Sequence, residues 1–482
     1  MCSVNRKMER YGMFDKFKKL SENIGLFTIC NFGQKILSFL LLPLYTSYLT
    51  TEQYGTSDLI GTIASLLVPV FTISIADGVL RFTMDEPGNS SYMRYGLRVH
   101  IEGATVLILA EIVTFFCFHN LIPGRYYIWI FMIYISQALN TLYLNYLRGV
   151  DNVPTMVVAN LLTTSITLLL NVALIVFFHL GLNGLLLATV IGNLSCVLFV
   201  EKKEYILKRV LSSPPLPEKK RYDVVRYSIP QIFSSLAWWI NSSLDRIFVT
   251  AICGLSGNGI YSMAYKIPNI SSIFERIFSQ AWLLSSVKEF DEDDTDSYFS
   301  TAFSIYNLLL LVISSTIILM NIPISRFLYV GDFFEAWKCV PYLIAASYFN
   351  ALNAFIGNIY MAAKRPKEAS ISAVISAVMN FTFNILLIPK MGIVGAAIAT
   401  MVSYIVVYLI RLFSVKKVIR WRIPQNKILL SQLLLIIQVI LAYTEYHFYI
   451  LQVACVLIII MLHYRFGKKL VLKMVELLRQ RL

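Results

Sequence analysis

Apolar runs of about 20 residues recur along this chain, and that length lets an α-helix cross the hydrocarbon core of a bilayer. A transmembrane β-barrel would instead show short segments of alternating hydropathy. The pattern therefore predicts an all-α polytopic membrane protein of about 14 transmembrane helices. We expect these spans at residues 24–48, 57–80, 99–119, 126–147, 153–178, 183–200, 227–252, 259–286, 299–321, 336–361, 370–389, 393–412, 428–444 and 447–465.

The composition agrees with a membrane location. Of the 482 residues, 57% are hydrophobic and only 15% are charged, whereas a soluble protein carries about a quarter charged residues. The formal net charge of +14 would suggest a nucleic-acid partner in a soluble protein. Here the basic residues lie mostly in short loops, so we interpret them as topology signals that also meet anionic membrane lipids, and we expect no nucleic acid.

The distribution of positive charge predicts the orientation. Basic residues gather before the first span, in the loops after spans six, ten and twelve, and in the tail. If the N-terminus is cytoplasmic, all of these segments face the cytoplasm. The opposite loops then hold only Arg125, Arg326, Lys338 and Lys390. By the positive-inside rule both termini are cytoplasmic. The first 20 residues are polar and basic, so we expect no cleavable signal.

The two halves of the chain resemble each other. Four features of the first half recur in the same order in the second: residues 55–63 and 259–267, 146–154 and 360–367, Asn171 and Asn384, and 181–189 and 392–400. We predict two six-helix lobes in parallel repeat plus two C-terminal helices. The boundaries are 1–222 for the N-terminal lobe with its proline-rich cytoplasmic linker, 223–420 for the C-terminal lobe, and 421–482 for spans 13 and 14 with a basic tail.

Cationic side chains interrupt the first two spans of each half: Lys35, Arg81, Arg246, Lys266 and Arg276. A charge at bilayer depth costs a few kcal/mol or more, so such residues usually face a polar cavity. We predict that these five bind an anionic substrate. Acids in the same spans nearly offset the cations and are predicted counter-ions or carriers of a coupling ion: Asp58, Asp77, Asp245 and Glu275.

Salt bridges between helices are the alternative role for these charges. Asp77 and Arg81 are four residues apart and can pair on one helix face, so we interpret that pair as structural. For Arg246, Lys266 and Arg276 we favour anion binding, because the planar guanidinium binds phosphate oxygens in pairs and stays charged when poorly hydrated.

A lipid-linked pyrophosphate would suit such cations, and its sugars would need hydrogen-bonding and stacking partners. Spans seven and eight supply candidates, although their aromatic members equally fit an interfacial belt. The candidates are Trp238, Trp239, Asn241, Ser242, Ser243, Tyr261, Tyr265, Asn269 and Gln280.

Catalytic signals are poor. The five histidines are far apart, no HExxH, GxSxG or P-loop motif occurs, and the seven cysteines form no CxxC pair. We therefore expect no enzyme, no metal site, no cofactor and no disulfide framework. Without an ATP site, transport would draw on a gradient or on substrate flux.

Several segments resemble the flippases of bacterial polysaccharide repeat units. Residues 32–38 (FGQKILS), 43–45 (PLY) and 49–55 (LTTEQYG) are similar to the opening of these proteins. Residues 243–249 (SLDRIFV) and 259–267 (GIYSMAYKI) are similar to their most recognisable segment, and residues 328–336 (LYVGDFFEA) to their outer loop before span ten. The resemblance runs from about residue 20 to residue 465.

This resemblance implies the multidrug/oligosaccharidyl-lipid/polysaccharide exporter superfamily and, within it, the O-antigen and capsule repeat-unit flippases. Such proteins are thought to move an undecaprenyl-pyrophosphate-linked oligosaccharide to the outer leaflet of the bacterial inner membrane. The five cations would fall in the cavity that the first two spans of each lobe line. A polysaccharide polymerase and glycosyltransferases are the implied partners, besides the lipid-linked substrate and membrane lipids.

Two alternatives remain at this point. A cation-coupled multidrug exporter of the same superfamily would need acids in its cavity, and the first span carries Lys35 but no Asp or Glu. A non-transporting scaffold of an envelope-synthesis complex would be indifferent to the loss of the cavity charges.

Overall fold

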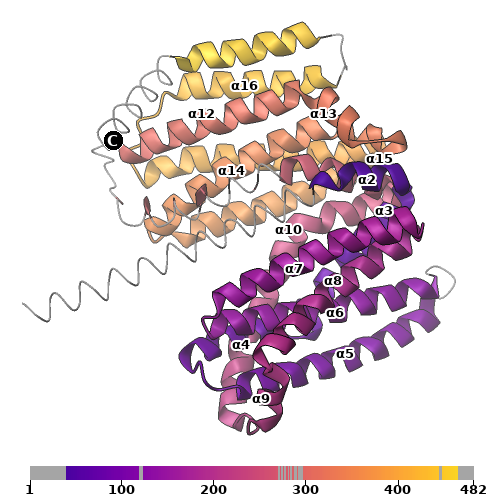
Figure 1. The fold of residues 1–482 in the computed structure, drawn as a ribbon. Helices are drawn as coiled ribbons and strands as arrows, with labels where there is room; N and C mark the ends of the chain where they lie inside the picture. The colour runs from indigo at the N-terminus through magenta and orange to yellow at the C-terminus, as the bar shows by residue number, and fades with distance from the viewer. Residues whose placement is uncertain are drawn as a thin grey trace, which may run out of the picture. The chain divides into compact units, whose positions relative to one another are not determined.

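The computed structural model describes residues 39–118, 123–269, 297–443 and 448–464, with eight single positions between 272 and 290 (Figure 1). Within these residues, nine helices are long and apolar enough to cross a membrane, and a pair bent by 48° adds a tenth. The protein is thus the predicted multi-pass, all-helical membrane protein. Residues 24–38 of the predicted first span lie outside the described residues.

Two of the nine helices are double-length: one holds predicted span seven and the start of span eight, and the other holds predicted spans eleven and twelve. They are interrupted by Gly254 in α10 (Glu218–Ala264) and by Gly392 in α15 (Pro366–Ser414), with φ of 76° and 59°. Glycine adopts this left-handed region without the penalty that a Cβ brings. The two arms of α15 lie side by side, since Asn380 donates to Thr400 across the break. The predicted separation of spans eleven and twelve is therefore confirmed.

The contacts divide the chain into two compact units, Met1–Leu244 and Asp245–Leu482. In unit 1, α6 packs against α3, α4, α5 and α8, and α7 packs along α8 (Figure 1). Buried aliphatic and aromatic side chains of these helices form its core. The helices of unit 1 are α2 (Leu42–Tyr48), α3 (Thr51–Phe71), α4 (Ile75–Asp85), α5 (Ser91–Phe118), α6 (Gly124–Gly149), α7 (Val153–Asn171), the π-helix η1 (Val172–Phe177), α8 (Gly181–Glu204), α9 (Ile206–Ser212) and the first part of α10.

In unit 2, α14 is the central helix and packs against α12, α15 and α16. The helices of unit 2 are the rest of α10, α12 (Tyr298–Leu319), α13 (Asn321–Leu328), the 3₁₀ helix η2 (Gly331–Lys338), α14 (Val340–Ala362), α15, the 3₁₀ helix η3 (Val415–Lys417), α16 (Gln425–Ala442) and a last helix, Tyr449–Tyr464. The division between the units falls inside α10, and the predicted boundaries at 222/223 and 420/421 stay predictions about functional lobes.

The two units carry the sequence repeat in their local structure. Gly181 and Gly392 occupy matching positions, and both begin a helix arm with a positive φ. Gly395 approaches the arm before it so closely that a Cβ would lie 2.4 Å from the Leu387 carbonyl oxygen, and Gly184 likewise abuts Leu174. These two pairs of glycines agree with the predicted duplication, which otherwise stays a prediction.

The second predicted span differs from expectation because it is broken. Residues 57–80 were expected as one helix, but α3 ends at Phe71 and α4 begins at Ile75. Pro69 lacks an N–H for the helical ladder, and Ile73 and Ser74 adopt left-handed φ values of 48° and 50°. Irregular backbone at membrane depth is tolerated where it is buried in protein or lines a cavity.

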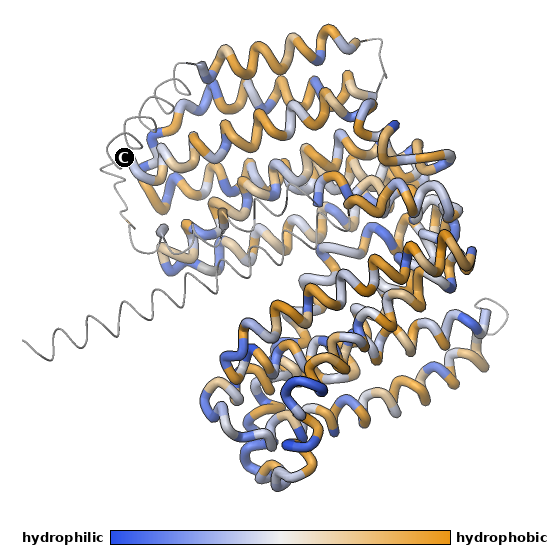
Figure 2. The backbone as a smooth tube through the Cα atoms, viewed as in Figure 1, coloured by the Kyte–Doolittle hydropathy of each residue, from blue (hydrophilic) through white to orange (hydrophobic). Residues whose placement is uncertain are grey.

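The surface chemistry fits a bilayer. Figure 2 shows hydrophobic residues along the middles of the helices of each unit and hydrophilic residues mainly toward their ends. On α5, Ile101, Val113 and Phe116 are each more than 60% exposed. An apolar face of this kind is unfavourable in water and natural in lipid.

Candidate functional site

A polar cavity of about 410 Å³ lies in unit 1, where the break between α3 and α4 meets α6 and the first part of α10. Four serines, two threonines, one carboxylate and two indoles dominate its lining, which is unusual among helices otherwise rich in Leu, Ile and Phe. The lining residues are Ser65, Val68, Pro69, Thr72, Ser74, Ala76, Asp77, Thr141, Ser234, Ser235, Trp238 and Trp239.

The broken helix shapes this cavity. The Thr72 hydroxyl donates to the Val68 carbonyl at 2.7 Å, and the Ser74 N–H donates to the Pro69 carbonyl at 2.9 Å, so the turn is closed by its own bonds. The Ser74 hydroxyl, on a side chain 5% exposed, has no hydrogen-bond partner within the described structure. A buried polar atom without a partner costs free energy, which a polar ligand or a water would recover.

Asp77 is held from a neighbouring helix. Its Oδ1 accepts a hydrogen bond from Asn145 Nδ2 on α6 at 3.1 Å. Arg148, one turn further along α6, adds a favourable Coulomb interaction. The carboxylate is therefore positioned at the cavity wall by α6.

The predicted Asp77–Arg81 pair is wrong. Arg81 instead binds Asp85, one turn further along α4, with 2.6 Å between Nη1 and Oδ1. Both side chains of this pair are about half exposed, and Arg81 is not among the residues that line the cavity. Asp77 and Asp85 each lie four residues from Arg81, so helical spacing allows Arg81 to pair with either. Asn145 already donates a hydrogen bond to Asp77, and Arg81 pairs with Asp85.

The first part of α10 closes the cavity by packing on α3 and α4. Trp239 Nε1 donates to the Thr62 carbonyl on α3 at 3.0 Å. On α4, Gly78 lies so close to Ser228 that a Cβ at position 78 would be 2.4 Å from the Ser228 hydroxyl oxygen. Trp238 and Trp239, predicted as sugar-contacting residues, both line this cavity.

Unit 2 gathers a second group of predicted residues around Asp245, which is 5% exposed. Its Oδ2 accepts hydrogen bonds from Tyr261 at 2.6 Å and Tyr265 at 3.0 Å. The Arg246 guanidinium lies over the Tyr265 ring, 5.8 Å from its centroid. Asp245 and Arg246 precede the break at Gly254, and Tyr261 and Tyr265 follow it, so the turn there brings the four residues together.

The other predicted site residues are dispersed. Glu275 Oε1 accepts from Asn350 Nδ2 of α14 at 3.3 Å. Asp58 on α3 and Lys266 beside Tyr265 are half-buried. Lys35, Arg276 and Gln280 lie outside the described residues. Substrate or ion binding by the nine charged residues stays a prediction.

Sequence reasoning missed one buried cation. Arg411, 9% exposed, was counted as a loop charge, but it holds the two arms of α15 to α14. Its guanidinium donates to Ser372 Oγ at 2.8 Å, to the Asn353 carbonyl at 2.5 Å and to the Ala369 carbonyl at 3.1 Å. The sequence did contain a signal that Arg411 is buried, because the residues on both sides of it are apolar.

Comparison with known families gives two matches. The family described as polysaccharide biosynthesis protein matches residues 20–284. The family described as lipid II flippase MurJ matches residues 224–475. The two matches overlap in α10 and the residues that follow it.

Two curated relatives come from archaea. The chain is 26% identical over 206 residues to a Haloferax volcanii protein described as "Probable low-salt glycan biosynthesis flippase Agl15", covering 42% of this chain and 43% of that protein. It is 29% identical over 191 residues to an uncharacterized membrane protein of Methanocaldococcus jannaschii, covering 38% and 37%. The chain thus spans less than half the length of these relatives.

Among solved structures, the lipid II flippase MurJ in its inward closed conformation has a TM-score of 0.62 at 16% identity, covering 92% of this chain and 99% of that chain. An inward-facing multidrug resistance MATE family transporter also has a TM-score of 0.62, at 14% identity, covering 80% and 95%. At such identities the likeness shows the fold alone. Because the first family match extends over more than half of the chain, this protein belongs to the polysaccharide biosynthesis protein family.

Proposed function

We propose that this protein is a flippase for a lipid-linked oligosaccharide and not an enzyme. The family membership supports this function, as does the second family match, to lipid II flippases. The relative from Haloferax volcanii is itself described as a probable glycan biosynthesis flippase. The protein supplies a membrane passage, and the substrate keeps its covalent structure.

The finer proposal concerns the substrate and the cycle. An undecaprenyl-pyrophosphate-linked repeat unit for a cell-surface polysaccharide, such as O-antigen or capsule, enters from the cytoplasmic leaflet of a bacterial inner membrane and leaves in the outer leaflet. The two lobes alternate in access, and both termini are cytoplasmic. The pyrophosphate meets some of the predicted cations Lys35, Arg81, Arg246, Lys266 and Arg276, while the acids Asp58, Asp77, Asp245 and Glu275 balance them or carry a coupling ion. Glycosyltransferases and a polymerase act before and after this step.

One observation carries the proposal: the polar cavity at the broken second span. Sugars offer many hydroxyl groups and apolar ring faces. The cavity offers serine and threonine hydroxyls, one carboxylate and the indoles of Trp238 and Trp239. Indole rings provide large, rigid contact area together with an N–H donor. A cavity with this lining fits the headgroup of a glycolipid better than an apolar compound.

A second candidate is export of a cationic drug. The Asp77 carboxylate at the cavity wall could attract a cation, and the fold is equally similar to a MATE family transporter. The six hydroxyl side chains around Asp77 favour the glycan over the drug.

The test uses the full chain reconstituted in liposomes. The substrate is a fluorescent undecaprenyl-pyrophosphate oligosaccharide, and its arrival in the far leaflet is measured by access of an added glycosidase. We expect Trp238→Ala to slow flipping about tenfold, the factor that corresponds to about 1.4 kcal/mol of lost contact. Asp77→Asn removes the one carboxylate and should also slow flipping.

Phe233→Ala is the matched control. Phe233 lies on the same helix as Trp238, the two side chains are 69% and 71% exposed, and Phe233 does not line the cavity. Its loss should leave the rate unchanged. Equal flipping by wild type, Trp238→Ala and Asp77→Asn would refute the role of the cavity. Drug resistance conferred on a sensitive strain, without glycolipid flipping, would favour the second candidate.

A further inference from the structure

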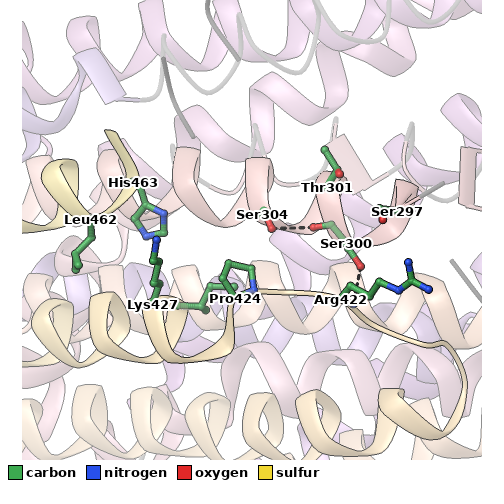
Figure 3. A pocket seen from close by; sticks show the side chains of 10 residues that line it. Ser297, Ser300, Thr301, Ser304, Arg422, Pro424, Lys427, Leu462 and His463 are labelled. Carbon is green, nitrogen blue, oxygen red and sulfur yellow. Dashed lines mark hydrogen bonds between the residues drawn. The ribbon is translucent and has the colours of Figure 1, made fainter. Parts of the chain in front are cut away.

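A second polar cavity, of about 340 Å³, lies in unit 2 and shares no lining residue with the first. Figure 3 shows it between the start of α12, the segment that leads into α16, and the end of the last helix. The lining residues are Ser297, Ser300, Thr301, Ser304, Arg422, Pro424, Lys427, Ile428, Leu462 and His463.

Among the described residues, the lining of this cavity is basic. Arg422, Lys427 and His463 contribute basic groups, and no carboxylate belongs to the lining among the described residues. In Figure 3 the Lys427 side chain points toward the His463 ring, and the Arg422 guanidinium extends past Ser300 at the other end. An anion held between Arg422 and Lys427 would lower the repulsion between these two cations.

The backbone adds to the positive potential. Helices α12 and α16, of 22 and 18 residues, both begin at this cavity. Neither N-cap residue, Ser297 nor Pro424, makes a side-chain capping hydrogen bond within the described structure. The N-terminal turn of a helix favours negative charge, and two such turns converge here.

The cavity is held in shape by contacts between its walls. The Arg422 N–H donates to Ser300 Oγ at 2.9 Å, which ties the segment before α16 to α12. His463 Nε2 lies 3.2 Å from Ser431 Oγ, which ties the last helix to α16. The two long cationic side chains, Arg422 and Lys427, remain exposed, so a ligand can reach them.

The surroundings indicate where the ligand comes from. Ile428 and Leu462 form the apolar part of the lining, and α16 continues from there with exposed Leu430 and Leu433. These side chains offer a path for acyl chains beside the cationic cavity. By the positive-inside rule the basic segment 416–427 faces the cytoplasm, where anionic lipid headgroups are abundant.

We propose that this cavity binds the phosphate group of an anionic phospholipid of the cytoplasmic leaflet, in a site distinct from the glycan cavity of unit 1. The same phosphate chemistry could be met by free phosphate from the cytoplasm. The lipid is favoured because an apolar helix face adjoins the cations. Basic pockets between membrane helices bind such headgroups in general.

The experiment uses the purified full chain in mixed micelles and measures retention of phosphatidylglycerol relative to phosphatidylcholine by native mass spectrometry. The double variant R422Q/K427Q should reduce phosphatidylglycerol retention about tenfold or more, from the contribution of each basic residue near an anionic headgroup. The matched control K367Q/K417Q removes two exposed lysines that do not line the cavity, and it should retain the lipid as the wild type does.

Competition separates the two sources of phosphate. Glycerol phosphate and inorganic phosphate are added as competitors. If they displace the lipid only at high concentration, the acyl chains contribute to binding and the ligand is a phospholipid. Displacement at low concentration by inorganic phosphate alone would overturn the lipid assignment in favour of a soluble anion. Equal retention of phosphatidylglycerol by wild type, R422Q/K427Q and K367Q/K417Q would overturn the site itself. Glycolipid flipping by R422Q/K427Q is measured separately from lipid retention. Because the two measurements are independent, failure of the phospholipid site can be told apart from failure of the proposed flippase function.

Discussion

Replacing Arg411 should destabilise unit 2 through the loss of three defined hydrogen bonds. The guanidinium joins the Asn353 carbonyl on α14 to Ala369 and Ser372 on the first arm of α15, while Arg411 itself lies on the second arm. A methionine at this position keeps much of the side-chain volume but has no donor. Arg411→Met therefore tests the polar contacts with little change in packing.

The magnitude follows from the count of bonds. Hydrogen bonds inside membrane proteins contribute about 0.6 kcal/mol on average and about 1.7 at most, so three bonds give about 2–5 kcal/mol. The methionine variant also avoids the free-energy cost of burying a charged guanidinium, and this gain opposes the loss of the hydrogen bonds. Arg411 lies three residues before the end of α15, where the cost of a charge is lower than at mid-bilayer, so the lost bonds should decide the sign. Arg411→Lys, which lacks the planar fork, should fall between wild type and Arg411→Met.

Thermal unfolding in detergent measures this effect. A thiol-reactive dye reports the exposure of Cys339 and Cys455, which are buried in unit 2. Arg365→Met is the control, because Arg365 is exposed and its loss should leave the unfolding temperature unchanged. A variant Arg411→Met as stable as the wild type, or more stable, would refute the reasoning, since charge burial would then outweigh the three bonds.

Three further predictions follow from single contacts. Gly392→Ala should cost about 1 kcal/mol in unfolding free energy because an alanine must adopt a left-handed φ of 59°, and the same dye assay measures it. Tyr261→Phe removes the 2.6 Å hydrogen bond to Asp245 and should lower the free energy of unfolding by about 1–2 kcal/mol; unchanged stability would contradict a contribution of that bond. The hydrogen bond from Lys220, with a smaller contribution from Asn89, lowers the pKa of Glu86 below its usual 4.5. The stabilisation from this pair is therefore present above pH 4.5 and is lost as the pH falls through the lowered pKa, and Lys220→Gln should flatten the acid limb of a stability–pH curve.

Several features of the fold were accessible from the sequence because they depend on local chemistry. Long apolar runs place helices in lipid whatever their neighbours are, and apart from the broken second span the described helices overlap the spans that those runs predict. The repeat was readable because Gly181 and Gly392 each serve a backbone conformation that glycine adopts most easily. Trp238 and Trp239 were singled out as possible sugar contacts, and both line the cavity of unit 1.

Partners across helices were decided only by the tertiary structure. Asp77 could pair with Arg81 by spacing, but Asn145 from another helix engages it, and Arg81 turns to Asp85. The cavity of unit 1 likewise combines residues more than 150 positions apart, brought together by packing of α10 on α3 and α4. Helical periodicity and hydropathy act within one segment, whereas the partner of a buried polar group depends on which helix packs beside it. For this reason the sequence by itself determined the membrane class and the repeated halves, and tertiary packing determined which polar residues share a cavity.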